Sequence, residues 1–273
     1  MKCPVCSSPN VYRHKLIDDV QIFQCRKCLL AFVDPKTPRK NTGHIYEFSD
    51  YQKREGQFRK RYENTIRLLK KYSPGKKVLE VGAGFGLLSS MLSNRGYEVD
   101  ALEPDVVPHY LKDLPVSIIK KSFDPFAESH TKKYDAIILY DVLEHVDEPK
   151  KTIFLFKKLL KKNGIVFIQT PNYLSSMATM VKEWSWWMIE DHRFFFSKHS
   201  LALLFSKKTW KNRLYTTYEE WIDFKKNLDG NFVGNKLAKY LFFAWWMPYY
   251  FLFRRLMWIA GKGGLIVTIY QKK

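Results

Sequence analysis

The chain has 273 residues, of which 46% are hydrophobic and 27% charged, a composition that excludes a disordered chain. Its 46 basic and 27 acidic residues give a net charge of +19, which favours an anionic partner or serves solubility. The longest apolar stretch, residues 240–253, is interrupted by Pro248 and is shorter than the roughly 20 residues that span a bilayer. No apolar run follows a basic start. We therefore expect a cytoplasmic protein, either soluble or peripheral to the inner face of the membrane.

All four cysteines lie in the first 28 residues, as the pairs Cys3/Cys6 and Cys25/Cys28 with 18 residues between them. This spacing is typical of a zinc ribbon, in which each pair sits on a knuckle turn and four thiolates bind one tetrahedral zinc ion. Disulfides are the alternative, and a reducing cytosol disfavours them. A closed four-thiolate site is structural, so we expect a small zinc-ribbon module at residues 1–35. Such modules also recognise RNA, DNA or a protein partner.

A polar connection at residues 34–43 leads into a helical segment, and together they form a lead-in at residues 36–73. Apolar residues recur at helical spacing from Phe58 to Leu69, and Pro74-Gly75 ends the helix. From residue 74 strands alternate with helices, which predicts a doubly wound, mostly parallel α/β sheet. The expected strands are 77–81, 97–102, 116–119, 136–139, 165–169 and 214–218, and the expected helices are 86–95, 149–164 and 198–208, the last capped by Ser197.

We divide the rest of the chain into a core at 74–218, an aromatic helical insert at 219–262 and a last core strand at 263–273. Pro248 is expected to split the insert into two helical pieces. Packing as a lid, cap or dimer contact is one interpretation of the insert. Contact with a membrane or a lipid-linked acceptor is the other, because Trp and Tyr flanked by Lys and Arg suit a bilayer interface.

A glycine-rich turn, Glu80-Val81-Gly82-Ala83-Gly84-Phe85-Gly86, follows the first core strand. Glycines let the backbone turn sharply and approach a ligand closely. Glu103 ends the second strand, where a carboxylate can accept hydrogen bonds from a ribose diol. The spacing E-x-G-x-G-x-G differs from the dinucleotide pattern G-x-G-x-x-G. The turn and the acid together predict a site for a nucleotide-type cofactor.

Residues 74–210 resemble the class I S-adenosylmethionine-dependent methyltransferases. The motifs that carry the resemblance lie at 78–86, 122–124, 134–146, 169–172 and 192–201. It implies a Rossmann-like fold with an antiparallel last strand, for which residues 265–270 are suited. It also implies that the three glycines face the methionine part of the cofactor, Glu103 its ribose and Asp124 its adenine amino group. An Asp-Pro turn is the alternative for Asp124. The full set of cofactor-binding candidates is Glu80, Gly82, Gly84, Gly86, Glu103, Asp124, Tyr140 and Asp141.

The segment Asp141-Val142-Leu143-Glu144-His145 follows the fourth strand, at the edge where doubly wound folds bind ligands. His145 is the candidate catalytic base, because an imidazole with a pKa of about 6.5 can take a hydroxyl proton at neutral pH. Two alternatives stay open. In the first, the segment only shapes the loop. In the second, Asp141, Glu144 and His145 hold a divalent cation, as ExxEH motifs do in some methyltransferases. His192 and His199 are rival bases, for which structural roles are favoured.

The favoured function is O-methylation of a small-molecule, sugar or lipid-linked acceptor with S-adenosylmethionine. An RNA methyltransferase that uses the basic surface and the zinc ribbon is the first alternative. Against it, the basic residues are spread along the chain, and Thr170-Pro171-Asn172 differs from the N-P-P-Y motif of base amino methylation. A cofactor-binding scaffold without turnover is the second alternative.

Overall fold

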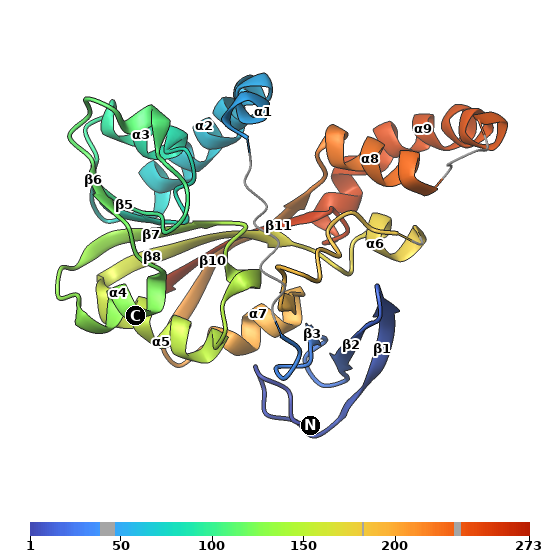
Figure 1. Cartoon of the computed structure of the whole chain (residues 1–273), viewed down its shortest axis with the longest axis horizontal. Coiled ribbons are helices and arrows are strands. Elements are labelled where there is room, and N and C mark those ends of the chain that lie inside the picture. The colour runs from blue at the N-terminus through green and yellow to red at the C-terminus, as the bar shows by residue number, and fades with distance from the viewer. Residues whose placement is uncertain (39–46, 182, 232–235) are drawn as a thin grey trace.

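The computed structural model describes residues 1–38, 47–181, 183–231 and 236–273. Its centre is a seven-stranded sheet with the order β10-β11-β8-β7-β4-β5-β6 (Figure 1). The pairs from β6 through β8 are parallel, whereas β11 is antiparallel to both of its neighbours. The expected doubly wound sheet with an antiparallel last strand is therefore confirmed. The strands are β4 (Lys77–Val81), β5 (Glu98–Leu102), β6 (Ser117–Ile119), β7 (Tyr134–Tyr140), β8 (Leu160–Pro171), β10 (Trp210–Tyr218) and β11 (Leu265–Lys272).

Helices cover both faces of this sheet, so its central strands are apolar throughout. In β7, Ala136 and Ile138 face one core cluster while Ile137 and Leu139 face the other, because side chains alternate along a strand. The first face carries α2 and α3, and the second carries α4, α5 and α7 (Figure 1). Their bounds are α2 (Glu55–Tyr72), α3 (Leu87–Ser93), α4 (Phe123–Ser129), α5 (Pro149–Leu159) and α7 (Lys198–Leu204), and a short α1 (Phe48–Lys53) precedes α2.

Two predicted helix ends were wrong. The helix that begins at Pro149 ends at Leu159 and not at Gly164, because Leu160 is extended and buried and pairs with Tyr134 as the first residue of β8. Burying the Leu160 side chain in the sheet stabilises the fold more than one further helical turn would. The helix after Ser197 ends at Leu204 rather than at residue 208. Its predicted start is confirmed, since Ser197 forms a reciprocal capping box with Ser200.

The N-terminal residues form a second, four-stranded sheet with the order β1-β2-β3-β9. Its first strands are β1 (Val11–Ile17), β2 (Val20–Cys25) and β3 (Ala31–Val33), and its edge is β9 (Phe194–Phe195), which comes from far along the chain. The Ser197 hydroxyl donates to the Cys28 carbonyl oxygen at 3.3 Å. The N-terminal module is thus joined to the core by backbone pairing. In the polar connection predicted at 34–43, residues 39–43 lie outside the described residues.

The aromatic insert forms α8 (Trp221–Asn231) and α9 (Lys236–Ile259), which project at one end of the molecule near the short α6 (Ser176–Met180) (Figure 1). The prediction that Pro248 splits the insert was wrong, because α9 continues through it. Pro248 and Ala244, four residues earlier, are both exposed. The Ala244 carbonyl that proline deprives of an amide partner can therefore be hydrated, which reduces the cost of a proline inside a helix. Among the described residues, no helix combines the length and apolarity needed to cross a membrane.

Candidate functional site

The glycine loop leaves β4 and turns into α3 at the carboxyl edge of the parallel strands. Gly82, Gly84 and Gly86 all have positive φ, at 71°, 53° and 85°, a conformation that other residues rarely adopt. A Cβ on Gly82 would lie 2.6 Å from Val142, whereas no heavy atom lies within 4 Å of a Cβ built on Gly84. Gly82 is therefore packed against the segment that follows β7. Gly84 faces open space, in which a ligand can approach the backbone.

Glu103 fastens this loop to the end of β5. One oxygen of its buried carboxylate accepts the Gly84 amide at 2.7 Å, and the other accepts the amides of Asp105 and Val106 at 3.0 and 3.2 Å. An ionised carboxylate has about four acceptor positions, so one remains for a further donor such as a ribose hydroxyl. The ribose contact of Glu103 stays a prediction.

A network of mostly half-buried polar side chains lies beside the loop, and the sequence reasoning missed most of it. Arg61 of α2 forms an ion pair with Glu220, and its Nε atom has no hydrogen-bond partner among the described residues. Gln169 of β8 donates to both oxygens of Asp141 at 3.0 and 3.2 Å and accepts from the Tyr218 hydroxyl at 2.6 Å. Arg61 could have been suspected from the sequence, because a cation at this position shares the apolar face of its helix with residues 58, 62 and 65.

Electrostatics link this network to the predicted cofactor candidates. Burial raises the pKa of Asp141, while the Arg61 guanidinium acts in the opposite direction. Asp141 has a positive φ of 51°, a strained value for a residue other than glycine. The hydroxyl of Tyr140, which precedes it, is hydrogen-bonded to Thr65 of α2. The structure therefore brings Tyr140, Asp141 and Arg61 to one corner of the site.

Two other cofactor candidates are placed differently. Glu80 lies buried behind the loop, where it accepts a hydrogen bond from Ser89 of α3, and burial together with the charge of Glu103 raises the pKa of Glu80 to about 8. Asp124 lies in the first turn of α4 and accepts from the Thr152 hydroxyl of α5 at 3.2 Å. Cofactor contact by Glu80 and adenine contact by Asp124 both stay predictions.

A second cluster of polar side chains follows β7 in the short 3-10 helix at Leu143–His145. Ligand atoms of Glu144, His145 and His192 all lie within 4.8 Å of one another, and the two imidazoles meet edge to face with centroids 4.7 Å apart. The structure thus joins His192, and not Asp141, to Glu144 and His145. His199, the other rival base, is exposed on α7.

The hydrogen bonds of this cluster define the tautomers of its histidines. Nδ1 of His145 lies 3.2 Å from the Asp191 carbonyl oxygen, and Nδ1 of His192 lies 3.1 Å from that of Trp186. A carbonyl oxygen only accepts, so both Nδ1 atoms carry a proton and Nε2 is the nitrogen of each ring that is left to accept one. Burial lowers the pKa of His192 to about 3, which keeps that ring neutral. His145 is half-buried.

Glu144 is the carboxyl group of this cluster. One oxygen accepts from the Thr170 hydroxyl at 3.0 Å, and the other has no hydrogen-bond partner among the described residues. Burial raises the pKa of Glu144 well above its usual range. The neutral acid that burial favours is a hydrogen-bond donor, so the cluster suits a polar ligand that presents an oxygen atom.

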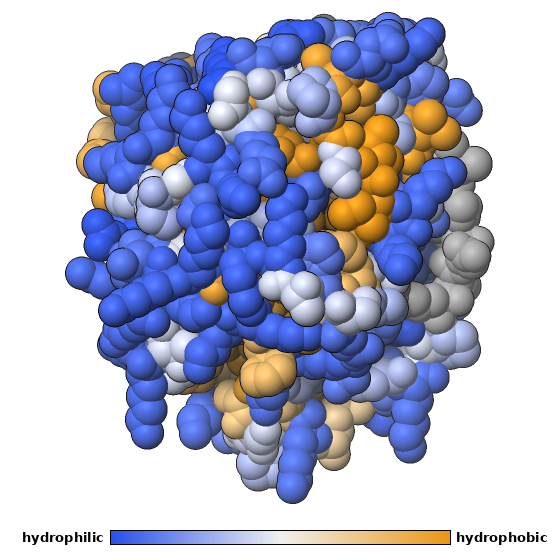
Figure 2. Space-filling model, turned by 90° about the vertical axis from the view of Figure 1, so that its left-hand side faces the viewer, coloured by the Kyte–Doolittle hydropathy of each residue, from blue (hydrophilic) through white to orange (hydrophobic). Residues whose placement is uncertain are grey.

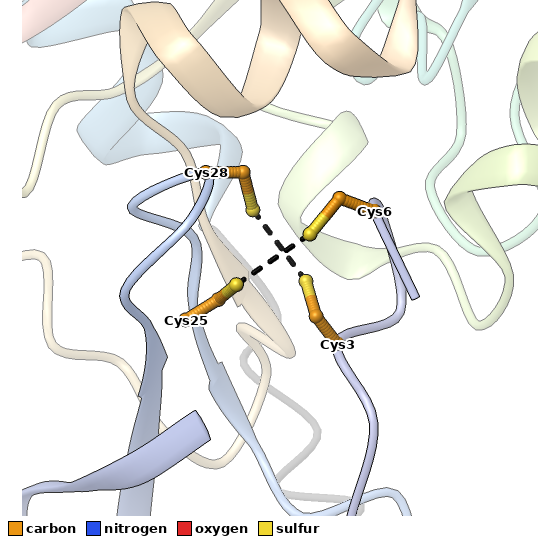
Figure 3. Close-up of side chains that lie close together, drawn as sticks. All are labelled: Cys3, Cys6, Cys25 and Cys28. Atoms are coloured by element: carbon orange, nitrogen blue, oxygen red, sulfur yellow. Dashed lines mark hydrogen bonds between the residues drawn. The ribbon is translucent and has the colours of Figure 1, made fainter. Parts of the chain in front are cut away.

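The four cysteines converge on one point, as Figure 3 shows. The Sγ atoms of Cys3 and Cys28 lie 3.5 Å apart, as do those of Cys6 and Cys25. Sulfur atoms around a tetrahedral zinc ion are separated by roughly 3.8 Å, which follows from a Zn–S distance of about 2.3 Å. The geometry of the thiols therefore fits one zinc ion.

The two knuckle turns have matching backbones. In each, the residue after the second cysteine donates its amide to the carbonyl of the first, Ser7 to Cys3 and Leu29 to Cys25, both at 2.9 Å. Ser7 and Leu29 also share a positive φ, 58° and 53°. Each turn thereby aims its two sulfur atoms toward the same centre.

A doubly wound parallel sheet with a glycine loop after its first strand and an acid after its second defines an α/β domain that binds a nucleotide-type cofactor. The model of the family described as "Methyltransferase domain" matches residues 52–213. The chain belongs to this methyltransferase family.

The curated relatives match a shorter part of the chain. A ubiquinone biosynthesis O-methyltransferase from Photorhabdus laumondii is 33% identical over 105 residues, which cover 36% of this chain and 44% of that protein. A protein of the same description from Proteus mirabilis is 35% identical over 105 residues, covering 36% and 43%. The chain thus spans less than half the length of these relatives.

Solved structures share the fold over most of the chain. A SAM-dependent methyltransferase from Archaeoglobus fulgidus has a TM-score of 0.56 at 15% identity, covering 84% of this chain and all of that one. A possible histamine N-methyltransferase from Thermotoga maritima has a TM-score of 0.52 at 16% identity, covering 83% and 96%. The predicted Rossmann-like methyltransferase fold is confirmed.

Proposed function

We propose that the protein transfers the methyl group of S-adenosylmethionine to a hydroxyl oxygen of a small or carrier-linked acceptor, with His145 as the base. The observation that carries this proposal is the position of His145. It follows β7, the strand next to β4, and its loop contacts Gly82 through Val142. A base at this place lies beside the loop that would hold the methyl donor. The O-methyltransferases among the relatives support oxygen as the acceptor atom.

The residues around the glycine loop fit the proposed cofactor. The open backbone at Gly84 suits the close approach of the homocysteine moiety, and the remaining acceptor position of Glu103 suits a ribose hydroxyl. The unpartnered Nε of Arg61 suits the carboxylate of an amino acid, since guanidinium groups bind carboxylates in charge-assisted pairs. These residues would bind the donor at both its nucleoside and its amino-acid ends.

Methyl transfer needs alignment more than acid catalysis, because the bound sulfonium supplies a methyl group that is already electrophilic. His145 would accept the hydroxyl proton at Nε2, while Nδ1 keeps its proton on the Asp191 carbonyl. The acceptor oxygen then forms its bond to the methyl carbon as the carbon–sulfur bond breaks toward sulfur. Glu144 and His192 would orient the acceptor, because they are buried beside His145 and His192 stays neutral.

A structural zinc ion at Cys3, Cys6, Cys25 and Cys28 is part of the proposal. Its support is the convergence of four sulfur atoms on matched knuckle turns. A set of four thiolates leaves no open coordination position, so the ion would hold the N-terminal module together. It would take no part in methyl transfer.

The test is methyl transfer from radiolabelled S-adenosylmethionine to three acceptor classes: hydroxylated phenols, nucleotide-linked sugars and total RNA. We expect labelled methyl ethers from one of the first two classes. His145→Gln should lower kcat by about 100- to 10,000-fold without changing the affinity for S-adenosylhomocysteine, whereas the control His199→Gln should be fully active. Label in RNA alone would replace the proposal with the RNA alternative. Cofactor binding without label in any class would indicate the scaffold.

A further inference from the structure

Helix α9 carries a continuous apolar stripe on its outer face. The stripe residues follow one another at steps of four, four, seven, four and three, so they share one side of the helix. Each side chain is between 62 and 79% exposed. The α9 stripe consists of Leu237, Leu241, Trp245, Leu252, Leu256 and Ile259.

The opposite side of α9 is already packed. Tyr250 is buried and stacks on Phe224 of α8 with ring centroids 4.6 Å apart. Phe242 and Met247 pack against the same core cluster, which also contains Ile22 and Val33 of the N-terminal module. Because this inner side holds the helix on the protein, the α9 stripe faces away from the core and is exposed to solvent.

The charge of this part of the chain selects the class of partner. From Gly230 to Lys262 there are five lysines and arginines and no aspartate or glutamate. Arg255 is exposed within α9, and the Arg254 guanidinium lies over the rings of Phe251 and Trp258. An apolar helix face whose own segment carries only cations matches an anionic bilayer surface, into which apolar side chains insert while cations meet phosphates.

A second copy of the chain matches this surface less well. Pairing two α9 helices would bring their cations together, and neither helix contains a carboxylate that could neutralise them. The face of the molecule on the side of β6, which lies opposite α9 in Figure 1, is mostly hydrophilic, with one apolar patch (Figure 2). The molecule thus has an apolar, basic end and a hydrophilic end, an arrangement suited to lying on a surface.

We propose that α9 docks the protein on anionic phospholipid bilayers, with the α9 stripe inserted at the interface and the flanking basic residues against the lipid phosphates. With 24 residues, the helix would lie about 36 Å along the surface. This proposal does not depend on the methyl-transfer reaction, so a protein that lacks activity but binds vesicles would leave it intact.

The experiment is flotation of the full-length protein with two kinds of vesicle, phosphatidylcholine alone and phosphatidylcholine mixed with phosphatidylglycerol. The wild type should float with the anionic vesicles and stay at the bottom with the neutral ones. The triple variant Leu241→Ser, Leu252→Ser, Ile259→Ser should lose at least about tenfold in vesicle binding, because three apolar side chains no longer insert. Arg255→Gln should lose about fivefold, the effect of one surface cation.

The matched control replaces three exposed apolar residues elsewhere, Leu16→Ser, Phe154→Ser and Leu203→Ser, and should float like the wild type. Thermal unfolding and S-adenosylhomocysteine binding show that each variant is folded. Wild type that does not float with anionic vesicles at low salt would overturn the proposal, as would equal flotation of the stripe variant. A wild-type dimer in light scattering that the stripe variant converts to monomer would assign the surface to a second copy instead.

Discussion

Replacing Glu103 with glutamine tests the cofactor site at its most constrained point. The native carboxylate accepts three backbone amides, those of Gly84, Asp105 and Val106. Glutamine keeps the size of the side chain but presents one oxygen and one NH2 group, so at least one of these amides would face another donor. The change also removes the charge that a ribose hydroxyl would meet.

The expected loss can be worked out from the hydrogen bonds involved. A hydrogen bond to a charged group contributes about 1.5–3 kcal/mol, so losing one ribose contact should raise Kd roughly 10- to 150-fold. S-adenosylmethionine and S-adenosylhomocysteine should lose affinity equally, because they share the ribose. The free energy of unfolding should also fall by about 1–3 kcal/mol, since a buried amide is left without its acceptor.

Titration calorimetry with S-adenosylhomocysteine measures the affinity, and urea unfolding measures the stability. Asp105→Asn is the matched control, because it removes one negative charge from the same loop at an exposed side chain and leaves the Glu103 oxygens in place. Its Kd should match that of the wild type. If Glu103→Gln is folded and binds with unchanged Kd, Glu103 only fastens the loop and the ribose contact is refuted.

Three further predictions concern the charges and thiols of the structure. The double variant Arg61→Met, Glu220→Gln should weaken S-adenosylhomocysteine but not adenosine in calorimetry, because only the former has the carboxylate proposed to meet Arg61; an equal loss for both would contradict this. Burial raises the pKa of Glu80 to about 8, so folded protein holds a proton that unfolded protein releases above its pKa of about 4.3. The free energy of unfolding should then fall as pH rises across that window, by at most about 1.4 kcal/mol per pH unit, and Glu80→Gln should flatten the dependence in urea titrations. Elemental analysis should give about one zinc per chain in the wild type and none in Cys25→Ser; freshly purified wild type without zinc would disprove the metal site.

Features that depend on local chemistry could be predicted from the sequence. The glycine loop, the Ser197 cap and the two cysteine knuckles each need particular residues at fixed spacing, and each is found where that spacing put it. The doubly wound, mostly parallel sheet followed because alternating strands and helices leave few topologies open. Local sequence patterns were therefore sufficient to predict the fold class and the glycine loop at the centre of the candidate site.

Features that depend on residues far apart in sequence could not be predicted in this way. The ion pair between Arg61 and Glu220 joins helix α2 to the residue that precedes helix α8, and no motif relates these two positions. His192 reaches His145 only because the chain from β8 to β9 returns to the 3-10 helix after β7, where the Arg193 amide donates to the Glu144 carbonyl at 2.8 Å. Such contacts can be identified only from the tertiary structure, because the sequence around one partner does not indicate the other.

The pairing of β3 with β9 would couple two binding equilibria in separate parts of the chain. One is the proposed uptake of zinc by the four cysteines, and the other is the binding of a ligand near His192. Metal uptake by thiolates at the N-terminus is linked to folding, and here the folded segment includes Ala31–Val33, which pairs with Phe194–Phe195. His192 lies two residues before that pair, so ordering the proposed metal site would also restrain the histidine that lies beside Glu144 and His145. By thermodynamic reciprocity, a ligand that holds His192 in place would raise metal affinity by the same factor as metal raises the affinity for that ligand.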